Sequence, residues 1–506
     1  MKHWHLSKHK HLNSHISKLK NIIQNNLMAQ NISRFKKVSI LSIICFTLLN
    51  ITVNAQQVIS LQQAVDSTIK NNLTIKQAQL TEALANEDYN QAKYNQLPTI
   101  SANPQGGYYF GKSQIAGAFA YSTSALNING AATASLVLYQ GGQLRNQILQ
   151  NKLTLDADKT STAKVKNDLL LNVVTDYLTI LTDQDLVIAA QQQLELAKIT
   201  LDRAQKNFDA GNATRADLAQ AQAQVETAEL NLTNDQNQVD LAILVLKQYM
   251  EMDPGKQIVI EKPDISKLTN IRTVYDETEV IKTAFTTNPD IKLAELQQET
   301  YAQAIKVAKG NYYPILSLYG GLGTSYSNQA TNFNETPNGT TSQIGFVQGT
   351  NAAVLAPNFT TTTTPISFGS QLSNNFNQYF GLSLQIPIFN HYTARTSVRK
   401  AKLNYEYAEL TTALAKNTLS KTIIQAVLDL QAAEKSYQSS LQTYNSNKEA
   451  LNVTKQRYDA GLVNTLDYNT ALTNYNTSQN NMIEAQYQVV FRSKVIDYYI
   501  GNPIVL

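Results

Sequence analysis

Two stretches of the chain carry small apolar residues at alternating intervals of three and four positions. One series runs through residues 187–208 and another through residues 218–246. This spacing keeps the apolar residues on one side of a helix and is typical of helices that pair as a coiled coil. Residues 144–210 also contain neither Pro nor Gly, which predicts a single helix of roughly 100 Å. We therefore expect a long helix that pairs with the helix returning after it.

Four other segments show strand patterns. They are nearly free of charge, and in the last of them Phe380, Leu382 and Leu384 alternate with other residues, as in a sheet with two unlike faces. Aromatic residues lie toward the segment ends, as in a membrane β-barrel. A soluble sheet is the alternative, because each strand pattern is weak by itself. The four segments are residues 98–110, 130–139, 312–326 and 378–389.

The second half of the chain repeats the first. The peptide NFDAG at residues 207–211 recurs as RYDAG at residues 457–461. Each unit contains an opening helical segment, two strands and a long helical hairpin, and such a repeat fixes the architecture. In the first unit the opening segment covers residues 61–96, is interrupted at Asn71-Asn72 and ends before Pro98.

The repeat divides the chain into four parts. These are a leader at residues 1–55, a first repeat at 56–250, a connecting segment at 251–277 and a second repeat at 278–506. An insertion rich in Asn, Thr and Gly at residues 327–377 separates the strands of the second repeat. It predicts a long exposed loop on the extracellular side.

The second hairpin keeps the helical spacing with more polar residues, among them Tyr437, Ser440 and Tyr444. The polar groups of such a seam would be unfavourable in a core without water. They suit helices that pack loosely and face water on one side. We infer that the second hairpin lines an aqueous space and that the first hairpin supports it.

The leader has the features of a secretory signal. Residues 1–55 hold eight Lys and Arg and no Asp or Glu, and an apolar run covers residues 38–53. We expect cleavage after Ala55, because small residues follow the apolar run. A transmembrane anchor is the alternative, but the run is shorter than the roughly 20 residues that a span requires. Met28 is an alternative initiator.

Composition excludes several classes of function. Beyond the leader the chain has 34 basic and 38 acidic residues, so its charge does not favour a nucleic-acid partner. It also has no Cys and a single His, His391, beyond the leader, which argues against disulfides, thiol catalysis and His-based metal sites. No phosphate-binding loop or catalytic set is found, and Asp183 and Asp185 are interpreted as a solvated helix face. We therefore expect no enzyme activity, no catalytic residues, no metal site and no cofactor.

These residues resemble the TolC-type outer membrane efflux proteins. The resemblance covers about residues 57–506 and depends on the duplicated turns after the long helices and on the helix–two-strand–helix order of both halves. It implies a mainly α fold with a membrane β-barrel: a homotrimer in which each chain gives four strands to a 12-stranded barrel and the helices form a periplasmic α-barrel. Four strands alone cannot close a pore in lipid, so closure requires other chains.

The resemblance also assigns roles to the two hairpin turns. It implies that a periplasmic adaptor protein docks on Ala210 and Gly211 in the first turn and on Ala460, Gly461 and Leu462 in the second. Asn212 departs from the apolar residue usual after the first glycine. Independently of docking, both glycines are predicted to end their helices in the left-handed conformation.

The resemblance further implies an entrance constricted by aspartates. Asp467 matches the first ring position, whereas the second ring position falls on Thr470 and the locking arginine of some members falls on Val463. Three Asp467 carboxylates around one axis would repel one another and favour cations. Asp217, the equivalent residue of the first hairpin, is the second candidate for the constriction, but it also has the form of a capping box with Thr214, and capping is the favoured interpretation there. Helix capping is an equal alternative for Asp467.

Two classes of function remain. The first is the outer membrane channel of a tripartite efflux or type I secretion system in a diderm bacterium. It would be a passive duct with a periplasmic extension, opened by the adaptor and an inner-membrane pump. The second is a secreted coiled-coil protein with a structural or adhesive role and no pore. The sequence does not indicate the transported substrate, since the pump selects it.

Overall fold

The computed structural model describes residues 57–111, 113–115, 118–120, 124–263 and 274–502. The predicted signal sequence and its cleavage site after Ala55 lie outside these residues. No helix of the described part is long and apolar enough to cross a membrane.

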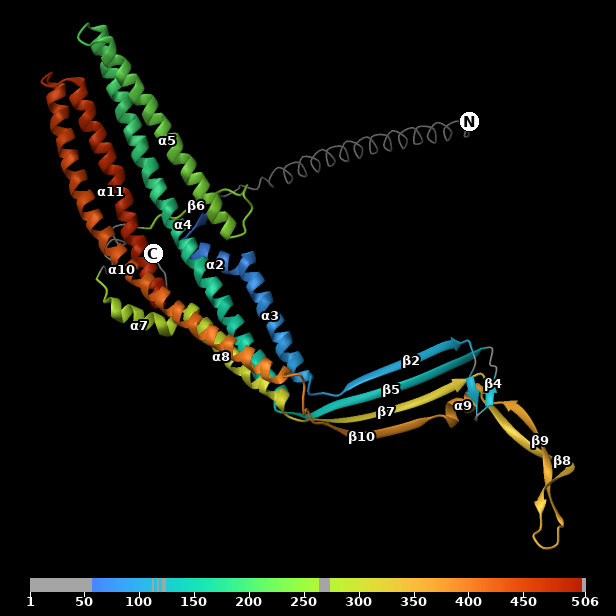
Figure 1. Ribbon diagram of the computed structural model, residues 1–506. Coiled ribbons are helices and arrows are strands. Elements are labelled where there is room, and N and C mark those ends of the chain that lie inside the picture. The colour runs from blue at the N-terminus through green and yellow to red at the C-terminus, as the bar shows by residue number, and fades with distance from the viewer. Residues whose placement is uncertain (1–56, 112, 116–117, 121–123, 264–273, 503–506) are drawn as a thin grey trace, which may run out of the picture. The chain divides into compact units, whose positions relative to one another are not determined.

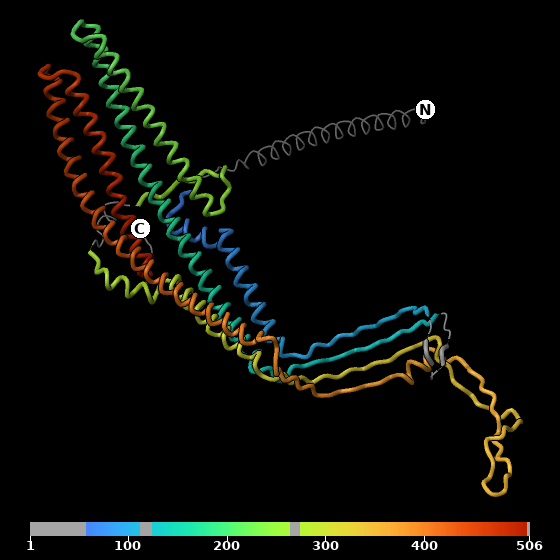
Figure 2. The backbone as a smooth tube through the Cα atoms, viewed as in Figure 1, coloured from blue at the N-terminus to red at the C-terminus, as the bar shows by residue number. Residues whose placement is uncertain are grey.

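The two halves of the chain have the same order of elements (Figures 1 and 2). The first half contains α2 (Leu61–Asn71), α3 (Leu73–Tyr94), β2 (Thr99–Tyr109), β5 (Ala125–Gln140), α4 (Gln143–Asp209) and α5 (Arg215–Tyr249). The second contains α7 (Glu277–Thr287), α8 (Pro289–Lys309), β7 (Ile315–Ser327), β10 (Asn377–Gln385), α10 (Thr393–Asp459) and α11 (Thr465–Ile500). The predicted duplication is confirmed.

An asparagine divides the opening helical segment of each half. The Asn72 side chain accepts hydrogen bonds from the backbone N–H groups of Thr74 and Ile75 at the start of α3. Asn288 caps α8 in the same way, and Pro289 occupies the first helical position, where its missing N–H is not needed. The interruption expected at Asn71-Asn72 is therefore a cap between two helices.

The long helices pair as the apolar spacing predicts. Helices α4 and α10 each have 67 residues, and each is followed by a helix that returns along it. In the first hairpin Leu194, Ala197 and Val225 form a buried cluster, with Leu201, Ala228 and Leu232 packed against it. In the second hairpin no residue of α10 beyond Leu430 is buried, whereas Tyr468, Asn469, Leu472 and Ser478 of the returning helix α11 are buried.

The four main strands form one antiparallel sheet in the order β10-β7-β5-β2. Their bounds differ from the prediction by more than one residue in three places. β5 starts five residues earlier than expected, because residues 125–129 pair with β2 and residues 127–129 also pair with β7. β7 starts at Ile315, since Gly310–Tyr312 forms a 3-10 turn. β10 ends at Gln385, shortly before Pro387, which has no N–H to give to the strand ladder.

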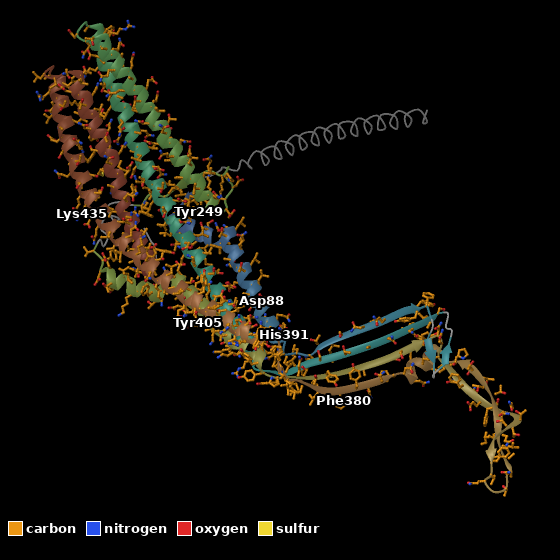
Figure 3. The ribbon with its side chains drawn as sticks, in the orientation of Figure 1. Asp88, Tyr249, Phe380, His391, Tyr405 and Lys435 are labelled. Atoms are coloured by element: carbon orange, nitrogen blue, oxygen red, sulfur yellow. The ribbon has the colours of Figure 1, made fainter. Side chains whose placement is uncertain are left out.

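The sheet has one apolar and one polar face. Leu382 pairs with Leu318, which pairs in turn with Leu136 of β5. Phe380, labelled in Figure 3, lies on this face and is 89% exposed. The opposite face carries hydroxyl groups, including Ser101 and Thr133, whose side-chain oxygens are 3.0 Å apart. The alternation expected from Phe380 onward is confirmed up to Gln385, where β10 ends.

The insertion, predicted as a long exposed loop, is largely exposed but has regular secondary structure. It contains an antiparallel hairpin of β8 (Thr331–Phe346) and β9 (Ala353–Pro365), followed by the short helix α9 (Phe368–Asn374). Threonines fill much of β9, and this β-branched residue favours strands even where no core covers it. A smaller hairpin, β3 (Ser113–Ile115) with β4 (Ala118–Ala120), lies between β2 and β5 in the chain.

A short ladder forms a separate unit. β1 (Gln57–Ile59) pairs with β6 (Ile258–Ile260), which lies in the predicted connecting segment. Within this unit the Lys256 ammonium donates to the Gln57 side chain at 2.6 Å.

Candidate functional site: the hairpin turns and the sheet

Both long helices end in the same glycine turn. Gly211 and Gly461 have φ of 77° and 72°. The N–H of Asn212 donates to the carbonyl of Asn207 at 2.8 Å, and the N–H of Leu462 donates to that of Arg457 at 2.8 Å. This is the hydrogen-bond pattern of a Schellman cap. The predicted left-handed glycines are confirmed.

The Asp217 side chain caps the start of its own helix, α5. Its carboxylate accepts from the backbone N–H of Thr214 at 3.0 Å and from the Thr214 hydroxyl at 2.7 Å, while the Asp217 N–H donates back to that hydroxyl. The Thr214 hydroxyl and N–H, followed by the Thr465 hydroxyl of the second hairpin, lower the pKa of Asp217. The capping box expected here is present.

Asp467 is arranged differently. Its N–H donates to the Asn464 side chain at 2.8 Å, but Asn464 and Asp467 make only this half of a capping box. The Asp467 side chain is exposed. Its carboxylate thus stays available at the turn, unlike the carboxylate of Asp217.

The turns of the two hairpins are joined by side chains that the sequence analysis did not identify. Arg203 of α4 forms an ion pair with Asp459 of α10 and also lies 5.8 Å from the centre of the Tyr458 ring. Tyr458 stacks on Tyr468 of α11, with ring centres 4.9 Å apart. Val453 occupies the position of Arg203 in the second repeat. This difference between the two repeats is the sequence signal that could have drawn attention to Arg203.

The polar seam of the second hairpin is built from paired aromatic and amide side chains. Tyr444 and Tyr475 have ring centres 5.7 Å apart. The Asn447 side chain donates to the backbone carbonyl of Asn474 at 3.2 Å.

In the described part of the chain no group of three or more His, Cys, Asp or Glu residues could hold a metal ion.

Aromatic side chains lie at both ends of the sheet. Tyr139, Tyr312 and Phe389 lie at or next to the strand ends that adjoin the helices, and the rings of Phe389 and His391 have centres 5.5 Å apart. His391 is labelled in Figure 3. The other strand ends carry Tyr108 and Tyr109. Two aromatic belts flanking an apolar band are typical of an outer-membrane barrel wall.

Comparison with known proteins identifies the family. The chain matches the outer membrane efflux protein family over residues 64–250 and 280–502. It is 24% identical over 459 residues to the outer membrane protein TolC of Escherichia coli (strain K12), covering 88% of this chain and 82% of that protein. It is 22% identical over 451 residues to TolC of Salmonella enteritidis, with the same coverage.

Solved structures share the fold. The structure of CusC has a TM-score of 0.71 at 15% identity, covering 88% of this chain and 92% of CusC. The outer membrane channel CmeC of Campylobacter jejuni has a TM-score of 0.68 at 18% identity, covering 87% of this chain and 85% of CmeC. With the matched residues covering most of both repeats, the chain belongs to the outer membrane efflux protein family of TolC-type channels, which are not enzymes.

Proposed function

We propose that three copies of this chain form a passive export duct that spans the outer membrane and extends into the periplasm. The observation that supports it best is the sheet, which has an apolar face, a polar face and two unpaired edges, β2 and β10. Open edges are not tolerated in lipid, whereas three such sheets joined edge to edge would close a 12-stranded barrel. The apolar face would meet lipid and the hydroxyl face would meet water.

The two turns are the proposed docking sites for a periplasmic adaptor protein, which would couple the duct to an inner-membrane pump. At the second turn Leu462 is 70% exposed, and an apolar side chain on a rigid glycine cap suits a protein contact. Ala460 and Gly461 would let the partner approach the backbone closely. Ala210 and Gly211 of the first turn would contribute less, since polar Asn212 occupies the position of Leu462.

Docking is testable separately from conduction. Leu462→Asp should reduce dye efflux from cells that contain this channel with its pump and adaptor, while single-channel conductance of the purified protein stays unchanged. Asn212→Asp is the matched control at the first turn and should have a smaller effect. Equal efflux in the wild type and Leu462→Asp would contradict the docking role.

Asp467 is the proposed constriction at the periplasmic entrance, and Asp217 serves the helix cap. Purified wild-type protein in a planar bilayer should give small, stable, cation-preferring current steps. Asp467→Ala should raise the conductance or weaken block by divalent cations, because the charge ring is lost. Asp217→Ala is the matched control and should leave block unchanged.

The alternative of a secreted coiled-coil protein without a pore is tested by the same recordings. Absence of current from well-folded samples of both the wild type and Asp467→Ala would overturn the proposal that the protein forms a duct. Unchanged block in Asp467→Ala, with currents present, would overturn only the role of Asp467.

A further inference from the structure

An open cleft of about 540 Å³ lies where all four long helices meet. It is lined by residues of α4, α5, α10 and α11. It lies along the helical hairpins, away from the proposed docking turns and from the sheet.

Asp183 of α4 lies in this cleft, and its surroundings are unusual for a carboxylate. It is only 9% exposed, so the predicted solvated face is wrong for this residue. Among the described residues none donates a hydrogen bond to Asp183 or forms an ion pair with it. Asp185, two positions on, is by contrast paired with Lys262 and accepts from the Tyr487 hydroxyl at 2.8 Å.

The charged groups near Asp183 are all acidic. Burial, followed by the charges of Asp235 on α5 and Glu484 on α11, raises the pKa of Asp183 to about 6. Burial also raises the pKa of Asp235. No Lys, Arg or His is among the residues that line the cleft, and α10 supplies only the hydroxyls of Ser436 and Ser440. A buried carboxylate without a cation is costly unless a ligand compensates it.

The arrangement selects the type of cation. These carboxylates are not grouped closely enough for a metal ion, since no such group of three is found in the described chain. Several ammonium groups joined by methylenes would reach separate carboxylates and also donate to the Gln238 and Asn481 side-chain oxygens. The methylenes would lie along Leu186 and Ala485, the apolar part of the lining.

We propose that this cleft is a binding site for a linear organic polycation of the spermidine class, one per chain. Asp183 and Glu484 bind its ammonium groups, and Asp235 adds to the negative potential. Bound between both hairpins, the ligand stabilises their packing against each other.

The test is calorimetric titration of spermidine into the purified, detergent-solubilised full-length mature protein at pH 7.5. We expect one site per chain. Asp183→Asn and Glu484→Gln should each weaken binding about tenfold or more, because each removes one charge-assisted contact. Wild-type binding should also weaken at pH 5, where Asp183 takes up a proton. Circular dichroism checks that each variant is folded.

The control is Asp202→Asn, which removes an equal charge from the same helix at an exposed carboxylate paired with Lys206. It should bind spermidine like the wild type. The proposal is overturned by absence of binding to wild type, by equal weakening in Asp202→Asn, or by Mg²⁺ competing at the same concentration as spermidine, which would indicate general charge attraction. It is likewise overturned if Asp183→Asn binds like wild type.

Discussion

At the scale of single residues, the ends of the long helices follow from local chemistry. Gly211 and Gly461 take a left-handed conformation that other residues reach only at a cost. Thr214 and Asp217 then start the next helix by bonding to each other's backbone. Both features were predictable, because caps depend on residues within one turn of the chain.

Gly461→Ala tests the turn of the second hairpin. No atom lies within 4 Å of an added Cβ, so the cost is purely conformational, about 1 kcal/mol. Hydrogen exchange at the turn amides should therefore be faster in Gly461→Ala than in the wild type. The increase should be smaller in Gly461→Asn, because Asn adopts the left-handed conformation more readily than Ala. Gly369→Ala, at an equally open position without a left-handed φ, serves as control. Unchanged exchange in Gly461→Ala would contradict this account.

Asp217 provides a pH-dependent contact. Its pKa is lowered in the folded state, which means that the ionised carboxylate stabilises the fold. This stabilisation is present above the ordinary pKa of 3.8 and is lost as the pH falls through the lowered pKa. Asp217→Asn should therefore speed hydrogen exchange in the first turn of α5 at pH 6, and this difference should shrink toward pH 3. Thr214→Val should weaken the same turn. A difference that is constant over this range would contradict the assigned contact.

Single residues were also where prediction from sequence failed. Asp183 was interpreted as solvated because a heptad pattern describes one helix pair, whereas its burial comes from the approach of the other hairpin. Arg203 was missed for the same reason, since its partner Asp459 is 256 residues away.

At the scale of elements, the repeat predicted the number, type and order of the main helices and strands. Strand ends were less predictable. Residues 125–129 belong to β5 only because β2 and β7 extend beside them, and pairing of that kind is not encoded locally. The exposure of the insertion was predicted, but its strands were not, because a Thr-rich polar hairpin lacks the apolar alternation that marks a strand covering a core.

The β8–β9 hairpin is expected to be dispensable for the sheet. Ala330 and Ile366 at its base are already joined by a backbone hydrogen bond of 3.0 Å. Deleting residues 331–365 should thus leave the circular dichroism melting temperature and the single-channel conductance nearly unchanged.

Gln371→Ala is the contrasting variant. Its side chain bonds to the backbone of both Ser327 and Ile366, which anchors α9 to the end of β7. Loss of this buried side chain should lower the melting temperature more than the deletion does. The reverse order would show that the hairpin supports the sheet.

At the scale of the whole molecule, the ion pair between Arg203 and Asp459 links the two hairpins near their turns. We expect this contact to hold the proposed entrance narrow. Arg203→Ala should increase single-channel conductance or the fraction of time spent in larger current steps, because the hairpins separate more easily.

The matched control is Lys206→Ala, whose ion pair with Asp202 stays within one helix. It removes the same charge near the turn without uncoupling the hairpins. If both variants change conductance equally, the effect is one of charge, and the link between hairpins is not what restrains the entrance.

The duplication, the paired 67-residue helices, the glycine turns and the alternation of strand faces could be derived from the chain alone, since each depends on periodicity or on neighbouring residues. The register that makes one face of the four-stranded sheet continuous, the side chains that join the two hairpins, and the burial of Asp183 in a cleft that also contains Glu484 emerge from the folded molecule. Those features depend on contacts between segments hundreds of residues apart, and no local pattern records which residues will meet.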